Sequence, residues 1–129
     1  MKRAYFFGIF MVLALALTTT TAFAESDKNA AIKGQEITAT GQITCTFCKL
    51  SHPDKVCAKG CCERCIKAGD PPLLTTADGD QYILLTGEHE VPLMSPERYA
   101  MLDGTVQVKG VLIQGQGVQA IYVESMEKR

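Results

Sequence analysis

The chain has 129 residues, among them six cysteines and two histidines, and its formal net charge is −1. This length excludes a large multidomain enzyme and predicts one domain, because domains typically contain about 100–200 residues. A hydrophobic fraction of 47% together with so little net charge excludes a disordered chain. The small net charge also gives no reason to expect a nucleic-acid partner. The number of cysteines in so short a chain is therefore the feature that most needs an explanation.

The beginning of the chain has the pattern of an export signal. Two basic residues precede an apolar run at 4–17, and Ala22 and Ala24 offer the small side chains that signal peptidase requires. The run is shorter than the ~20 apolar residues of a transmembrane helix, although an uncleaved anchor is an alternative. We therefore expect a signal peptide at 1–24, a flexible segment at 25–34, and a periplasmic or secreted mature protein without membrane attachment.

Residues 35–129 are predicted to form a single, mainly β domain with a cysteine-rich insertion at 45–69. Ile37, Ala39 and Ile43 alternate with polar residues, as in a strand with one buried face. Asp-Gly dipeptides and Pro96 mark turns and a helix start. The expected strands cover residues 35–45, 73–76, 81–85, 105–113 and 119–126, and a short helix covers residues 96–102.

This order of elements is that of the OB topology, in which a short helix joins strands three and four of a five-stranded barrel. Residues 35–128 thereby resemble the small exported bacterial OB-fold proteins, chiefly through the element order and the segments 74–85 and 104–123. The resemblance implies a five-stranded OB-like barrel with a cysteine-rich helical lobe after strand one. Some proteins of that kind bind metals or other ligands, but a fold alone does not fix a function.

All six cysteines lie in the insertion, with the spacing C-x2-C-x8-C-x3-C-C-x2-C; they are Cys45, Cys48, Cys57, Cys61, Cys62 and Cys65. The two C-x2-C pairs have the spacing found in tetrathiolate zinc sites. The first part, Cys45 to Cys48, is predicted to form a short turn, or knuckle, and residues 56–68 are predicted to form a helix. The sulfurs of this helix would lie in one stripe, and the knuckle could fold onto it. A cluster of thiolates also suits Cu(I), which is a soft ion.

We therefore predict a zinc or Cu(I) site in the cysteine-rich lobe, separate from the barrel that carries it. The pairs Cys45/Cys48 and Cys62/Cys65 are the expected primary ligands, while Cys57 and Cys61 are secondary ligands or complete a second site. His52 could add a nitrogen ligand. Five basic and two acidic residues lie between positions 45 and 67, and nearby cations favour the thiolate form. The expected partners are a metal ion and a periplasmic metalloenzyme or redox partner.

Two other functions stay open. Export permits three disulfides, which would give a disulfide-stapled OB-fold binding module. The confinement of the cysteines to one lobe argues against this, because disulfides there would not staple the barrel. A thiol redox or electron-transfer accessory protein, with one C-x2-C pair cycling, is the second alternative.

Several further chemistries are excluded or less favoured. Covalent haem attachment would need C-x-x-C-H, whereas Lys49 and Ile66 follow the two pairs. No catalytic motif is present, so we do not expect an enzyme. His89 and Met94 could suit copper, but a surface position for His89 and a packing role for Met94 are the favoured interpretations.

Overall fold

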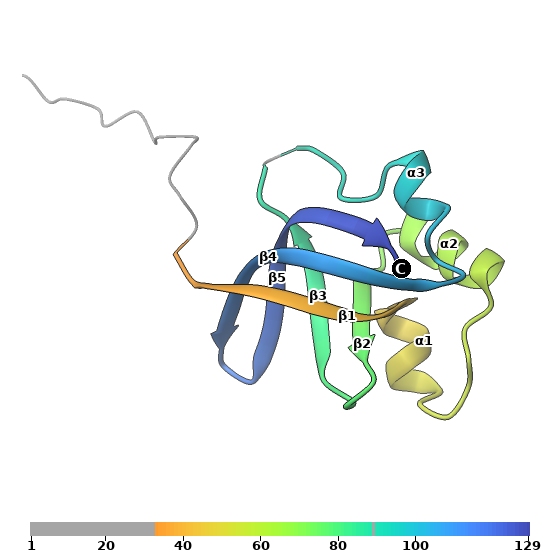
Figure 1. Ribbon diagram of the computed structural model, residues 1–129. Coiled ribbons are helices and arrows are strands. Elements are labelled where there is room, and N and C mark those ends of the chain that lie inside the picture. The colour runs from red at the N-terminus through yellow and green to blue at the C-terminus, as the bar shows by residue number, and fades with distance from the viewer. Residues whose placement is uncertain (1–32, 89) are drawn as a thin grey trace, which may run out of the picture. The chain divides into compact units, whose positions relative to one another are not determined.

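The computed structural model describes residues 33–88 and 90–129, so the predicted signal peptide, most of the 25–34 segment and His89 lie outside the described residues. The described chain is mainly β, as predicted, and its five strands form a closed barrel in the order β1-β2-β3-β5-β4 (Figure 1). The strands are β1 (Gln35–Cys45), β2 (Pro72–Thr76), β3 (Gln81–Thr86), β4 (Thr105–Gly115) and β5 (Val118–Lys128). The helices are α1 (Thr46–Ser51), α2 (Lys59–Lys67) and α3 (Pro96–Tyr99).

The barrel closes because β1 pairs with two neighbours. Its first part is antiparallel to β4, and its second part is antiparallel to β2. The two pairings overlap at Gly41 and Gln42. A side chain at Gly41 would collide with the backbone carbonyl of Thr75, so glycine permits the close approach of β1 and β2 there. β3 and β5 complete the barrel as a parallel pair.

The core fills the barrel with the inward-facing row of each strand. The predicted alternation in β1 is confirmed, because Ala39, Gly41, Ile43 and Cys45 are buried while Thr38, Thr40 and Gln42 are exposed. Apolar side chains of all five strands and of the lobe form one cluster. Its fully buried members are Cys45, Cys62, Leu74, Leu84, Val106, Val108 and Ile121.

The three helices lie together at one end of the barrel (Figure 1). α3 begins as its sequence predicts, because the Ser95 hydroxyl accepts a hydrogen bond from the Arg98 N–H (3.4 Å) and Pro96 occupies the first turn. The chain then turns back through residues 100–104, so α3 is shorter than predicted.

The helices of the lobe differ from the prediction. The expected knuckle is the helix α1, and the expected helix at 56–68 begins only at Lys59. In the sequence, Ser51 and Asp54 resemble a capping box that would start the next helix, but Ser51 ends α1 instead. Pro53 explains this, because a proline disfavours the helical conformation of the residue before it, and His52 accordingly leaves it (φ −139°, ψ 67°).

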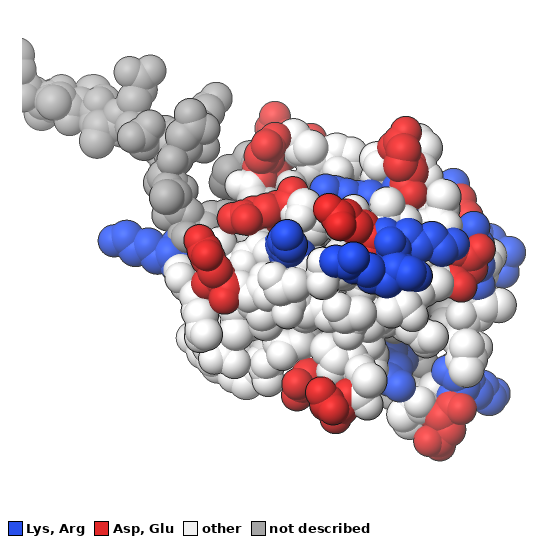
Figure 2. Space-filling model, in the orientation of Figure 1, with Lys and Arg blue, Asp and Glu red and all other residues white. Residues whose placement is uncertain are grey.

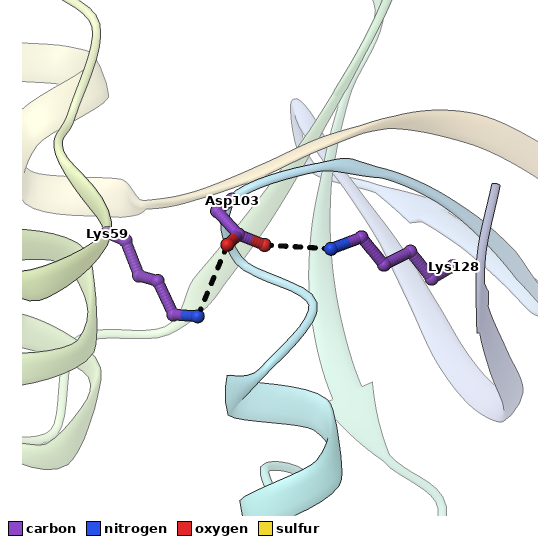
Figure 3. Close-up of polar contacts among 3 residues, drawn as sticks. All are labelled: Lys59, Asp103 and Lys128. Atoms are coloured by element: carbon purple, nitrogen blue, oxygen red, sulfur yellow. Dashed lines mark hydrogen bonds and ion pairs between the residues drawn. The ribbon is translucent and has the colours of Figure 1, made fainter.

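The lobe leaves and rejoins the barrel at one point. The Thr46 N–H (3.1 Å) and the Thr46 hydroxyl (2.7 Å) both donate to the carbonyl of Pro71. A second attachment lies at the start of α2, where Lys59 contacts Asp103 (3.4 Å) and Asp103 contacts Lys128 of β5 (3.0 Å; Figure 3). Within the described ranges, none of the helices has the length and apolar character needed to cross a membrane.

Candidate metal centre

The first two cysteines are placed by the junction of β1 and α1. Cys45 is the last residue of β1 and continues its inward-facing row, so its side chain is 0% exposed. It is also the N-cap of α1, and its sulfur accepts a hydrogen bond from the Cys48 N–H (3.4 Å). The first helical turn therefore brings the Cys48 sulfur back toward Cys45, so two cysteines with the C-x2-C spacing lie close together.

Five of the six sulfurs form two groups of three. Cys45, Cys48 and Cys65 make one group, and Cys48, Cys57 and Cys61 make the other; within each group the sulfur atoms all lie within 4.8 Å of one another. The Cys48 and Cys61 sulfurs are 3.9 Å apart. We call these the inner and the outer group, because Cys45 is buried whereas all three members of the outer group are partly exposed.

The sulfur spacing fits a metal ion in each group. Three sulfurs placed at about 2.3 Å around one ion in a plane lie about 4.0 Å apart, so small side-chain rotations close either group around an ion. Thiolate sulfur is the donor that soft ions such as Cu(I) prefer, and zinc also accepts it. The cysteine cluster can therefore hold a metal ion. Each of the six cysteines, all in the described part of the chain, is a free thiol.

The remaining candidate residues belong to neither group of three. Cys62 belongs to neither group; it is 1% exposed, packs in the core, and its sulfur lies 4.0 Å from the carbonyl of Ile43. His52 is exposed at the end of α1 and also belongs to neither group. Met94 is buried in the core, which confirms its predicted packing role.

The expectation of a separate site carried by the barrel is wrong. Cys45 and Cys62 belong to the same buried cluster as the barrel side chains, and Cys48, Cys57 and Cys65 pack against it. The reason is that α1 and α2 pack onto the end of the barrel, so the sulfurs facing that end become part of the core. The site and the fold therefore share residues.

Most of these cysteines are held as thiols. The pKa of Cys48 and of Cys65 rises to about 12, first because each thiol donates a hydrogen bond to Cys45 and second because of burial. Burial is the main reason that the pKa of Cys57 and of Cys62 also rises to about 12. The pKa of Cys61 is instead lowered, chiefly by a hydrogen bond from Cys48.

Part of the basic charge of the lobe is paired with other groups. Lys49 donates to the carbonyl of Pro53 (3.1 Å), Lys59 pairs with Asp103, and Lys67 pairs with Glu63 (2.6 Å). Figure 2 shows basic side chains gathered at the helical end of the visible face, with acidic side chains among them. Lys59 and Lys67 are therefore paired with acids, whereas Lys49 keeps its charge. A bound cation would further promote deprotonation of the thiols.

Comparisons with protein-family models, with curated proteins and with solved structures found no match to this chain. The sulfur geometry described above is therefore the basis for assigning a function.

Proposed function

We propose that this chain is an exported metal-binding protein that holds Cu(I) or zinc in its cysteine cluster. In this proposal its role is to deliver or buffer the metal, or to support a periplasmic metalloenzyme, and it is a binding protein rather than an enzyme. Export is supported by the pattern of residues 1–24. An OB-like barrel is supported by the strand order, the parallel β3–β5 pair and α3 between β3 and β4.

The observation that carries the proposal is the convergence of sulfurs from three elements. Cys45 comes from β1, Cys48 from α1 and Cys65 from α2, yet their sulfurs lie within 4.8 Å of one another. The pKa of Cys48 and of Cys65 is raised, so these thiols release protons when a cation binds, and the metal then stabilises the lobe as well as the site. A barrel of this size does not need such a cluster for stability alone.

The test is native mass spectrometry of the chain isolated after export and prepared without oxygen. The proposal expects added metal mass on the folded protein and its loss after a thiophilic chelator. His52→Ala is the matched control, because His52 is exposed and outside both sulfur groups, and it should retain the metal. Metal-free protein with six reactive thiols, or a mass six hydrogens low because of three disulfides, would contradict the proposal.

A thiol redox role is the second candidate, and one pair of residues favours it. The Cys61 pKa is lowered and its sulfur lies 3.9 Å from that of Cys48, so Cys61 is the more nucleophilic partner of an adjacent pair. Exchange with a disulfide reagent separates the two functions. A redox protein would form a Cys48–Cys61 disulfide and be reduced again reversibly, whereas a metal carrier would resist exchange when metal-loaded.

A further inference from the structure

We propose that the cysteine cluster binds two Cu(I) ions, and that the thiolate of Cys48 bridges them. This inference rests on the proposed metal-binding function and specifies the ion, the number of ions and the residue that joins them. The inner ion would be held by Cys45, Cys48 and Cys65, and the outer ion by Cys48, Cys57 and Cys61.

The two sulfur groups are joined through one residue. The two sulfur groups have Cys48 in common, and the other four sulfurs belong to one group each. A single ion within bonding distance of all five sulfurs would require larger movements than two ions that each take three. A thiolate sulfur has several lone pairs and can bind two soft cations at once. The position of Cys48 on α1, between β1 and α2, is what makes it the bridge.

The number of donors in each group distinguishes Cu(I) from zinc. Structural zinc is almost always bound by four ligands in a tetrahedron, whereas each group offers three sulfurs. Among the described residues, Cys62 is a further thiol, but its side chain is 1% exposed in the core and lies outside both groups. Cu(I) is satisfied by three thiolates and is the softer ion. The two three-sulfur groups therefore match Cu(I) better than zinc.

The charge of the metal-loaded cluster is balanced by the segment around it. Five thiolates exceed the positive charge of two Cu(I) ions, so the loaded cluster is anionic. The segment between positions 45 and 67 compensates for this, because its basic residues outnumber its acidic ones. When Cu(I) binds, each thiol that becomes a ligand loses its proton to solvent, and no electron is transferred.

The two positions differ in access. The inner group includes the fully buried Cys45, while each member of the outer group is partly exposed. Cys57 also lines a hollow of about 240 Å³ between the lobe and the turn before β4. The inner ion is therefore the more firmly held, and the outer ion is the one that can pass to an acceptor.

The experiment is an anaerobic titration of the full chain with Cu(I) against a chromophoric Cu(I) chelator, combined with native mass spectrometry. Wild type should bind two ions in two steps. Cys65→Ser should keep the outer ion and Cys57→Ser the inner ion, so each should bind one. Cys48→Ser should lose both. These cysteines are only partly buried, and circular dichroism of each metal-free variant checks that it folds.

The outcomes separate this inference from the proposed function. One ion per wild-type chain would overturn the two-ion inference and leave the metal-binding function standing, whereas no bound metal would overturn both. Retention of one ion by Cys48→Ser would overturn the bridge. X-ray absorption of the loaded wild type gives an answer that needs no variant, because a bridged pair shows copper–copper scattering and two isolated ions do not.

Discussion

Replacing Cys62 by alanine is expected to destabilise the protein without removing its metal. The Cys62 side chain is 1% exposed, packs in the core and belongs to neither sulfur group. Its removal forfeits about 1 kcal/mol of transfer free energy, close to that of a buried methylene. A sulfur-sized cavity of roughly 25 Å³ adds about 0.6 kcal/mol at about 24 cal/mol per Å³. The free energy of unfolding should therefore fall by about 1.5 kcal/mol.

Serine at the same position should cost more than alanine. The Cys62 sulfur lies 4.0 Å from the carbonyl of Ile43, and a serine hydroxyl, on a shorter bond, would lie beyond hydrogen-bonding distance of that carbonyl. A buried hydroxyl without a partner costs about 1–3 kcal/mol. The order of stability is therefore wild type, then Cys62→Ala, then Cys62→Ser.

The assay is urea unfolding of the reduced, metal-free protein, paired with the metal content of the loaded protein. Cys57→Ser is the matched control with the opposite pattern, because Cys57 is partly exposed and belongs to the outer group. It should lose the outer ion with little change in stability. If Cys62→Ala lost metal and kept its stability, Cys62 would be a ligand and its assignment to the core would be refuted.

Three further predictions concern pH and packing. The pKa of Cys62 is raised from 9.0 to about 12, so above about pH 9 the folded state keeps a proton that the unfolded state releases. The free energy of unfolding of the metal-free protein should therefore fall as pH rises above about 9. Urea unfolding should show a smaller fall for Cys62→Ala. The pKa of Asp103 is lowered from 3.8, first by its hydrogen bond with Lys128, so the stability that Asp103 contributes is present above pH 3.8 and is lost as pH falls through the lowered pKa. In acid unfolding, the stability of Asp103→Asn should therefore decline less steeply than that of wild type. Gly110→Ala should destabilise the barrel by about 1–3 kcal/mol in urea unfolding, because its side chain would collide with the carbonyl of the neighbouring strand. Gly115→Ala, which meets nothing within 4 Å, is its control, and equal effects of the two substitutions would contradict the packing argument.

The barrel could be predicted because its signals are local. A strand with one buried face needs alternation over a few residues, and β1 carries that alternation from Ile37 to Cys45. The Asp-Gly turn between β2 and β3 and the Ser-Pro start of α3 are likewise fixed by residues next to each other in the chain. The helix boundaries in the lobe were harder to predict. Ser51 resembles the capping residue of a helix, but Pro53 disfavours the helical conformation of the preceding histidine, so no helix starts there.

The sequence by itself determined that all six cysteines lie in one segment between the first two strands, and that their spacing suits a soft metal. Only the tertiary structure decided how the sulfurs are divided. Cys62 and Cys65 have equivalent positions in the C-x2-C pattern, yet Cys62 faces the core and Cys65 meets Cys45 and Cys48. The division depends on how α1 and α2 pack against the end of the barrel, and spacing along the chain carries no information about that direction.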